Sequence, residues 1–311
     1  MHKASLLRVL GPLSIALLAA CTGKTDGSGG SSAPGDLPVA IGPIDVPAGV
    51  ETTQCIVVPL NNATDVVMNG YDINLAPGSH HLIVYMTSAP LASDPVNCSP
   101  FTGLALGTDV PIAFAGKQQV SWAFPAGVAV EIPANQNIKI EAHYINTTAD
   151  DLQGHGDVTF HTTPKDSAPA YQPAGFAFYG TTNINIPPNS TVTTPQIFQA
   201  GPSGTHLIST FSHQHRLGTG VQVWASAQQG DMSDQIVNDV DWSNPTWKAI
   251  VPEFSFDGTS GLTFQCTWTN TTNQTVGFGE SALDEMCFTG GYIYPGSGLD
   301  FCVDGGCHHH H

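Results

Sequence analysis

Basic residues are scarce in this 311-residue sequence, which holds 8 Lys and Arg against 25 Asp and Glu and carries a formal net charge of −17. Cleavage of a leader containing Lys3 and Arg8 would take this charge to −19 and leave Arg216 as the one arginine. Proteins that bind nucleic acid neutralise phosphates with Lys and Arg, so the composition argues against a nucleic-acid partner. The acidity alternatively serves solubility alone.

A sustained helical repeat is also missing, because no stretch between Pro38 and Cys302 keeps an apolar period of 3.6 residues. Short alternating or β-branched runs recur instead between clusters of turn residues, in a chain with 23 Pro and 33 Gly. The sequence therefore predicts an all-β protein built from antiparallel, jelly-roll-like β-sandwiches. The predicted strands include residues 54–59, 82–86, 137–145, 156–161, 174–179, 206–211, 220–225 and 262–267.

The apolar run from Val9 to Ala20 is too short for a transmembrane helix. It follows two basic residues and ends in Leu18-Ala19-Ala20-Cys21, which resembles a bacterial lipobox. We therefore expect residues 1–21 to contain a lipoprotein signal peptide that is cleaved before Cys21, with lipid attached to that thiol. An ordinary secretory signal with an incidental cysteine is the alternative.

A lipid anchor places the protein in the bacterial cell envelope, with membrane contact through the anchor only. Thr22 follows the cysteine, and in lipoproteins of this kind a residue other than Asp here indicates the outer membrane. Residues 22–37 are rich in Gly, Ser and polar residues and are predicted to form a flexible tether. The terminal run His308 to His311 is interpreted as a purification tag and excluded from the site.

Seven cysteines are present, and lipidation of Cys21 would leave six, the even number that a disulfide framework in an oxidising compartment requires. Fifteen pairings of six cysteines are possible. The pairings that we favour each close a local loop: Cys55–Cys98, Cys266–Cys287 and Cys302–Cys307.

A proline-bearing stretch without an apolar pattern, residues 162–173, suggests a boundary between two domains. The predicted N-terminal domain, residues 38–165, contains one set of histidines, and the predicted C-terminal domain, residues 170–303, contains another. Two sandwiches that face each other across a solvent-filled cleft would hold a substrate between the two sets.

The C-terminal set begins with His213-Gln214-His215, and Met286 follows 71 residues after His215. Period-two alternation places Leu207, Ser209, Phe211, His213 and His215 on one strand face, so both imidazoles can bind one ion. Addition of a thioether gives a His2Met site whose soft sulfur favours Cu(I) over zinc and leaves one position open. The alternatives are two solvated histidines on a surface strand and a methionine that fills the core.

The N-terminal set consists of His80, His81 and His143. Neighbours on a regular strand face opposite ways, so His80 and His81 can meet one ion only where the strand ends or twists. Pro77-Gly78-Ser79 marks such a place. His143 lies on a predicted strand that could supply a third nitrogen.

Five segments occur in an order that resembles the copper type II, ascorbate-dependent monooxygenases, the family of peptidylglycine α-hydroxylating and dopamine β-monooxygenases. The likeness runs from about Val46 to Tyr294. Its most specific part is the His-x-His pair together with Asp284-Glu285-Met286-Cys287. The five segments are Glu51-Thr52-Thr53-Gln54-Cys55, Ser79 to Tyr85, Glu141 to Tyr144, Phe211 to Gly218 and Asp284 to Cys287.

This resemblance implies an enzyme with two copper ions per chain that hydroxylates a C–H bond with O2 and a reductant such as ascorbate. His80, His81 and His143 would hold an electron-transfer copper. His213, His215 and Met286 would hold the oxygen-binding copper and form the catalytic centre. The disulfides Cys55–Cys98 and Cys266–Cys287 would also match the family's pattern.

Three positions depart from the peptide-amidating members, which hold the substrate carboxylate with an arginine before the His-x-His pair and with Asn and Tyr after Met-Cys. Here these substrate-pocket candidates are Phe211, Phe288 and Gly290. Loss of the guanidinium and hydroxyl favours an uncharged apolar or aromatic group. We therefore expect a small organic or peptide-derived substrate, and not a peptide with a C-terminal glycine.

Other polar residues near the motifs have supporting roles at most. His206 is interpreted as a hydrogen-bonded supporting histidine on the strand face opposite His213, and His155 and His161 as solvated or structural. Asp284 and Glu285 either orient the ligands or are simply exposed carboxylates.

Two other functions fit the same sequence. One is a lipid-anchored copper-binding or copper-buffering protein that keeps the ligands without turnover. The other is a β-sandwich adhesion or glycan-binding module with incidental histidines, although this alternative leaves Met286 and both histidine sets unexplained.

Overall fold

Strands make up nearly all the regular structure of the chain, as the sequence predicts. The computed structural model describes residues 35–101 and 108–310, in which the short 3-10 helix η1 (Lys165–Ser167) is the one helix. The predicted signal peptide, the lipidation site Cys21, most of the predicted tether and His311 lie outside these residues. No helix within the described ranges has the length and apolarity needed to cross a membrane.

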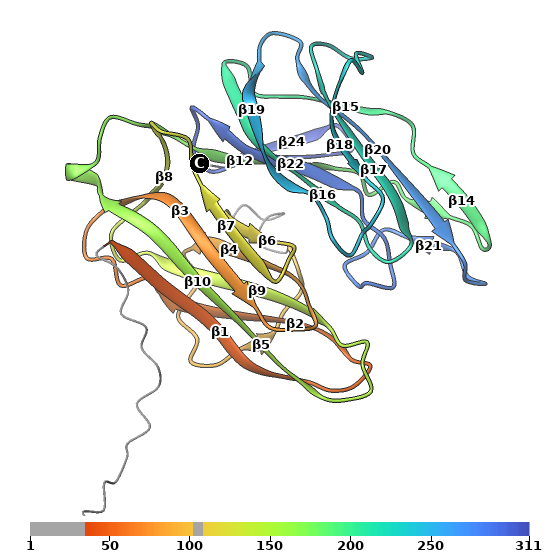
Figure 1. Cartoon of the computed structure of the whole chain (residues 1–311), viewed down its shortest axis with the longest axis horizontal. Helices are drawn as coiled ribbons and strands as arrows, with labels where there is room; N and C mark the ends of the chain where they lie inside the picture. Colours follow the sequence, from red (N-terminus) through yellow and green to blue (C-terminus); the bar gives the residue numbers. More distant parts are fainter. Residues whose placement is uncertain (1–34, 102–107, 311) are drawn as a thin grey trace, which may run out of the picture. The chain divides into compact units, whose positions relative to one another are not determined.

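Two sheets form the first half of the chain, drawn from red to yellow-green in Figure 1. Strand β3 illustrates the period of two, because Tyr71, Ile73 and Leu75 are buried while the residues between them are not. One sheet has the order β1 (Asp36–Val46), β10 (Leu152–Pro164), β3 (Val66–Leu75), β8 (Val128–Ile132) and β11 (Gln172–Pro173), with β7 (Gln119–Ala123) also paired to β3; the other has the order β5 (Val96–Asn97), β2 (Glu51–Pro59), β9 (Asn137–Ile145), β4 (Ser79–Thr87) and β6 (Asp109–Ala115).

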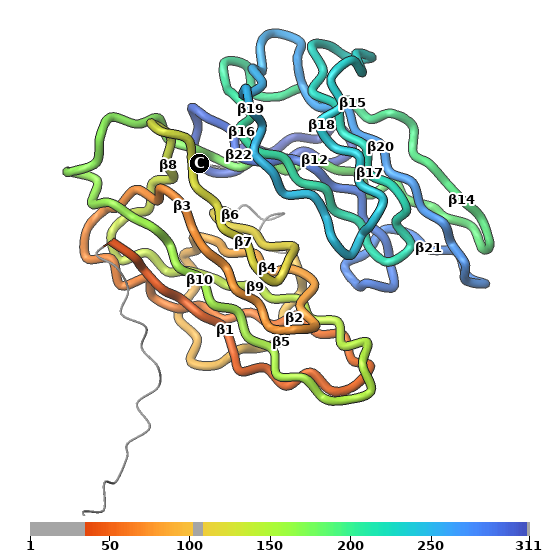
Figure 2. The backbone as a smooth tube through the Cα atoms, viewed as in Figure 1, coloured from red at the N-terminus to blue at the C-terminus, as the bar shows by residue number. Residues whose placement is uncertain are grey.

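Two further sheets and a short strand pair form the second half of the chain. In both halves, strands far apart in sequence lie side by side, as β1 and β10 do in Figure 2. The six-stranded sheet of this half has the order β19 (Trp247–Phe256), β16 (Thr205–His213), β22 (Phe288–Tyr294), β12 (Gly175–Gly180), β23 (Leu299–Val303) and β24 (Gly306–His310). The five-stranded sheet has the order β14 (Ser190–Thr193), β20 (Gly261–Asn270), β17 (Gly218–Ser226) and β18 (Asp234–Asp239), and β15 (Ile197–Ala200) also pairs with β20. The short strand pair consists of β13 (Asn185–Ile186) and β21 (Val276–Gly277).

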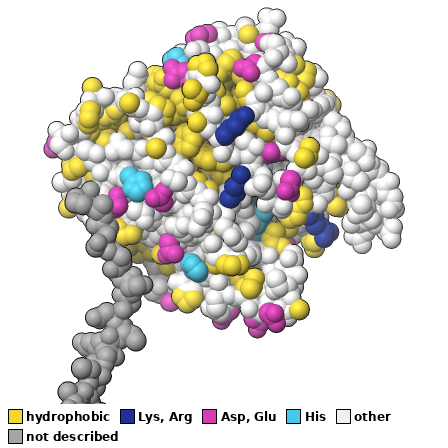
Figure 3. Space-filling view, in the orientation of Figure 1, with side chains coloured by type: hydrophobic (Ala, Val, Ile, Leu, Met, Phe, Trp, Pro, Cys, Tyr) yellow, Lys and Arg dark blue, Asp and Glu magenta, His cyan; other side chains and the backbone are white. Residues whose placement is uncertain are grey.

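The surface is acidic, as the composition requires. Asp and Glu side chains are scattered over the face drawn in Figure 3, and Lys and Arg side chains are few. A field of this sign repels anions approaching from solution.

Strands β12 and β22 are buried on both faces, which ties the two halves of the chain together. Alternation along β12 sends Phe176 and Phe178 into the apolar cluster that also contains the core of the first half. Ala177 and Tyr179 point the other way, into the cluster between the two sheets of the second half. One sheet therefore serves two cores.

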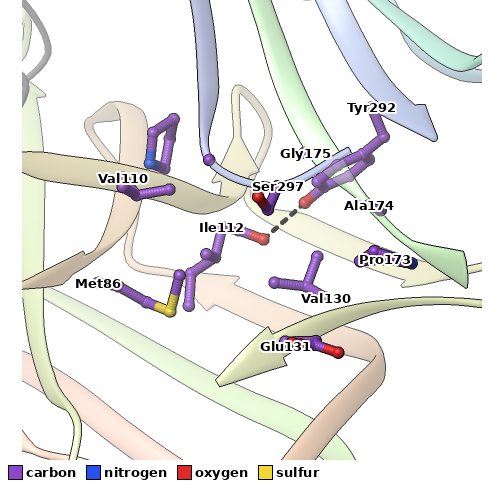
Figure 4. Close-up of a pocket in the computed structure, with 12 residues that line it drawn as sticks. Met86, Val110, Ile112, Val130, Glu131, Pro173, Ala174, Gly175, Tyr292 and Ser297 are labelled. Atoms are coloured by element: carbon purple, nitrogen blue, oxygen red, sulfur yellow. Dashed lines mark hydrogen bonds between the residues drawn. The ribbon is translucent and has the colours of Figure 1, made fainter. Parts of the chain in front are cut away.

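A buried hydrogen bond crosses from the second half to the first: the Tyr292 hydroxyl donates to the Ile112 carbonyl oxygen at 2.7 Å (Figure 4). Both residues are at most 1% exposed. The phenol can bury its ring in this position only because its polar end finds an acceptor.

All three favoured disulfides are present, namely Cys55–Cys98, Cys266–Cys287 and Cys302–Cys307. Cys302 and Cys307 face each other across the β23–β24 pair. The choice of local loops among the fifteen possible pairings is thus confirmed.

The predicted segment boundaries differ from the observed strands by a few residues. Strand β1 begins at Asp36, which pairs with His161, so the end of the predicted tether lies in a strand. Strand β10 continues to Pro164, into the stretch interpreted as a linker, because Thr162 and Thr163 still pair with β3. Strand β24 extends the last sheet beyond residue 303 and includes His308. These segments lack an apolar alternation that could have revealed their pairing.

The Tyr292 hydrogen bond makes a measurable contribution to stability. Tyr292→Phe should lower the free energy of unfolding by roughly 1–2 kcal/mol, because the Ile112 carbonyl loses its donor in a dry environment. Denaturant titration followed by circular dichroism measures the change. The control is Tyr294→Phe, whose hydroxyl bonds Glu253 at an exposed site and should change stability by less than about 0.5 kcal/mol. Equal losses in the two variants would contradict this account.

Candidate metal centre

Five buried or nearly buried histidines lie together where strands of both halves meet; we call them the histidine cluster. The N-terminal set lies on adjacent strands of one sheet, since His81 of β4 pairs directly with His143 of β9. The members of the cluster are His80, His81, His143, His213 and His215.

A β-bulge brings both His80 and His81 into the cluster. The pairing of β4 with β9 shifts between Ser79 and His81, and Gly78 just before it has a φ of +82°. An extra residue at a bulge breaks the alternation of side chains, so two neighbours can face the same region. The ring centroids are 5.1 Å apart for His80 and His81 and 5.0 Å apart for His81 and His143. The predicted break in regular strand geometry is confirmed.

The second pair follows the end of β16. His213 is the last residue of the strand and His215 lies in the turn after it, with ring centroids 5.2 Å apart. The alternation predicted from Leu207 to His215 is wrong in one respect: a register shift after Leu207 places that residue in one core and Phe211 in the other. The two histidines nevertheless face the same cluster.

Glu285 fixes the turn that carries His215. Its fully buried carboxylate accepts the backbone N–H groups of His215 at 3.1 Å and Leu217 at 2.6 Å. Burial raises the pKa of Glu285 to about 7, although the two N–H groups favour the charged form. Glu285 is therefore a positioning residue, and the interpretation of an exposed carboxylate is wrong for it.

Met286 lies next to this turn. His213 pairs with Phe288, and the His215 backbone N–H bonds to the carboxylate of Glu285, the residue just before Met286. The Asp284 carbonyl accepts a hydrogen bond from His215 Nδ1 at 3.2 Å, which leaves Nε2 as the ring nitrogen with a free lone pair. The Met286 side chain is 1% exposed. The structure thus places the backbone of Met286 alongside the His213–His215 pair.

The two histidine sets touch each other, so the predicted solvent-filled cleft between them is wrong. The ring of His80 lies 5.6 Å from that of His213 and 5.8 Å from that of His215, and His81 lies 5.5 Å from His213. Donor atoms within 4.8 Å of one another form two triads, His80–His81–His143 and His80–His213–His215. His80 belongs to both triads, which the spacing of residues along the chain did not reveal.

The electrostatics of the cluster favour the neutral form of four of its imidazoles. Burial, followed by the neighbouring histidines, lowers the pKa of His80 to about 3 and moves the pKa values of His81 and His213 well below their usual range. Burial and His143 lower the pKa of His215 to about 4. Neutral imidazole is the form that binds metal ions.

The donor atoms of the cluster fit a metal ion. Among the described residues, no hydrogen-bond partner meets the buried ring nitrogens His80 Nε2, His143 Nδ1, His213 Nε2 and His215 Nε2, or either nitrogen of His81. Buried polar atoms without partners are rare and costly, and coordination would satisfy them. Imidazole nitrogens are ligands suited to copper.

Glu51 connects the cluster to the segment that carries Met286. Its carboxylate lies 2.8 Å from His143 Nε2 and accepts the Ala282 N–H at 2.6 Å and the Ser281 hydroxyl at 3.1 Å. Although burial raises the pKa of Glu51, these hydrogen bonds lower it to about 2. Donation from Nε2 leaves His143 Nδ1, which faces the cluster, as the lone-pair nitrogen. The sequence included Glu51 in a motif but did not suggest this role.

An apolar cavity of about 280 Å³ adjoins Met286; we call it the phenylalanine cavity. Of the three predicted pocket residues, Phe288 lines it. Phe211 lies instead in the core. Gly290 has a φ of +152° and no room for a side chain, because a Cβ atom there would lie 2.0 Å from the Ala177 carbonyl oxygen. The aromatic residues that line the cavity are Phe101, Phe178, Phe278, Phe288 and Phe301.

Three other histidines, His155, His161 and His206, make their contacts outside the cluster. His206 is hydrogen-bonded, as predicted, and its partner is Ser255 at 3.0 Å. It lies seven residues before His213, which is roughly 23 Å along an extended strand. His161 lies between Asp36 and Asp72, and the side chain of His155 is 54% exposed. These contacts agree with structural or solvated roles.

Comparisons with known proteins identify the second half of the chain. Residues 176–310 match the family described as copper type II ascorbate-dependent monooxygenase, C-terminal domain. No curated protein matches the sequence. Similar solved structures include the major capsid protein P2 of bacteriophage PM2 (TM-score 0.36, 10% identity, 83% of this chain and 97% of that chain) and an archaeal-virus protein with a triple jelly roll fold (TM-score 0.22, 11% identity, 85% and 60%).

The contact between Glu51 and His143 should tune metal binding. Glu51→Gln should weaken Cu(I) affinity by roughly 10–100-fold, the usual effect of removing a carboxylate that orients a ligating histidine. Competition with a Cu(I) chelator measures the affinity. Glu253→Gln is the matched control, because its carboxylate lies 3.6 Å from His206, outside the cluster. An unchanged affinity in Glu51→Gln would show that Glu51 does not orient a ligand.

Proposed function

Because this chain belongs, through residues 176–310, to the copper type II ascorbate-dependent monooxygenases, we propose that it hydroxylates a C–H bond of an organic substrate with O2 and an ascorbate-type reductant. The observation that carries this proposal is the histidine cluster, with its buried imidazoles and unpartnered ring nitrogens, in which His215 bonds to the segment that carries Met286. In an adhesion or glycan-binding module with incidental histidines, these side chains would be solvated and not buried together.

We assign two copper ions per chain to two ligand sets that share no residue. The observed triads overlap at His80, and this assignment gives His80 to the first set alone. His80, His81 and His143 would hold the electron-transfer copper, and His213, His215 and Met286 the oxygen-binding copper. Copper bound in these places supplies the one-electron chemistry and the activation of O2 that hydroxylation requires.

The residues of the chain prepare the ligands and exclude water. Hydrogen bonds from the rings to Glu51 and the Asp284 carbonyl select which nitrogen of His143 and His215 is free to coordinate. Glu285 holds the turn after β16 through two backbone N–H groups. The phenylalanine cavity offers an apolar approach to Met286, in which a substrate can replace water.

The ligand assignment can be tested by copper loading. Anaerobic titration with Cu(I) should load two ions per chain, counted by metal analysis after desalting. His213→Ala should reduce the count to one, because it removes a donor of one triad and leaves the other intact. His206→Ala is the control and should still load two. The overlap of the two triads at His80 also fits a single shared ion, and a wild-type count of one would therefore contradict the two-ion assignment.

Activity should depend on the oxygen-binding set. We expect His213→Ala and Met286→Leu each to abolish substrate-dependent oxygen uptake with ascorbate while the circular dichroism spectrum stays unchanged. The substrate is found first, by screening a library with the wild-type protein. Met86→Leu in β4 is the matched control for the loss of sulfur. Full turnover in Met286→Leu would contradict the assignment of the oxygen-binding site. Tight copper binding without oxygen uptake on any substrate would favour a copper-buffering protein.

A further inference from the structure

We propose that the phenylalanine cavity binds an uncharged, ring-sized apolar group of the substrate. This inference rests on the proposed function and names the class of molecule that its site would take. The cavity lies beside the Met286 side chain and is lined mainly by Phe101, Phe178, Phe288, Phe301 and Val303.

The lining of the cavity selects against charge. Phe178 packs against three other rings of the lining, with centroid distances of 4.8 Å to Phe288, 5.8 Å to Phe301 and 6.0 Å to Phe101. A carboxylate or ammonium that entered would lose its hydration without gaining a partner among these rings. A flat apolar ring would instead make the offset or edge contacts that aromatic groups prefer.

The polar residues at the cavity offer little to a charged ligand. The Thr182 hydroxyl already donates to Asp304 at 2.6 Å. Glu280 is partly buried, and burial raises the pKa of its carboxyl group. An anion would be repelled by this carboxylate and by the acidic surface. A cation is the one charged group that Glu280 could attract, so it forms a separate arm of the test.

The size of the cavity sets an upper limit on the group. At about 280 Å³ it is nearly twice as large as an engineered apolar cavity of 150 Å³ that binds benzene. A phenyl ring with a short substituent, or two fused rings, would therefore fit. A longer chain would extend past Phe278, which is 40% exposed.

Phe101 forms the wall between the cavity and the histidine cluster. Its ring lies 5.7 Å from that of His81 and 6.4 Å from that of His213, centroid to centroid. Its φ of +57° is unusual for a residue with a side chain. Its N–H points to the two carboxylate oxygens of the fully buried Glu141, at 3.3 and 3.4 Å. Glu141 thus acts as a positioning residue for this wall, and a group in the cavity lies one ring away from the metal ligands.

Binding to the copper-free full chain tests the cavity apart from any turnover. Isothermal titration calorimetry would compare toluene, benzoate and benzylamine, which share one ring and differ in charge. We expect toluene to bind at least tenfold more tightly than either charged compound. Benzoate or benzylamine that bound as tightly as toluene would overturn the assignment of an uncharged group.

Two valine variants locate the binding. Val303→Arg places a guanidinium at the cavity and should weaken toluene binding at least tenfold, whereas Val251→Arg changes a residue that is 87% exposed on β19 and should leave binding unchanged. Phe278→Ala is a milder change at the exposed rim, and it should weaken toluene binding about fivefold. This variant tests the cavity even if Val303→Arg fails to fold. Unchanged binding in both Val303→Arg and Phe278→Ala would show that toluene binds elsewhere.

Failure of this inference can be distinguished from failure of the proposed function. If toluene binds in the cavity but the copper-loaded protein hydroxylates no aromatic or other organic compound, the cavity assignment stands and the monooxygenase proposal fails. If the loaded protein hydroxylates a charged compound and toluene does not bind, the monooxygenase proposal stands and the cavity assignment fails.

Discussion

Strands β12 and β22 of the six-stranded sheet in the second half are buried on both faces, and the site depends on this constraint. Because β12 and β22 serve two cores, the chain cannot separate its halves without exposing Phe176, Phe178 and Tyr292 to water. The same sheet contains β16, which ends at His213. Burial of this sheet against the first half therefore holds the second histidine pair against the first set.

Such a cluster is unfavourable for a protein that binds nothing there. Each buried imidazole loses its hydration and has a ring nitrogen without a partner among the described residues. Burial and close neighbours also lower the pKa values of His80, His81, His213 and His215. Glu51 and Glu285 add buried or half-buried carboxylates that hold His143 and the turn around His215. Other contacts must offset these costs, and the doubly packed sheet provides them.

The sequence predicted what depends on local pattern. Period two and turn residues located the strands, Pro77-Gly78-Ser79 indicated the break that brings His80 and His81 together, and loop closure favoured the correct disulfides. It could not predict what depends on three-dimensional packing. A single bulge after Leu207 cancelled the alternation expected along β16. The contact between the two histidine sets and the role of Glu51 join residues more than 90 positions apart, for which no local pattern exists.

The position of the phenylalanine cavity explains why the histidine cluster is buried. Neutral imidazoles and phenyl rings can share one dry region, whereas charged histidines would draw water into it. Phe101 contacts both parts, since its ring lies near His81 on one side and Phe178 on the other. The low pKa values of His80, His81, His213 and His215 and the apolar lining of the cavity therefore have the same cause, which is exclusion of water. Polar substitution of either part should disturb both, because neither can be hydrated alone.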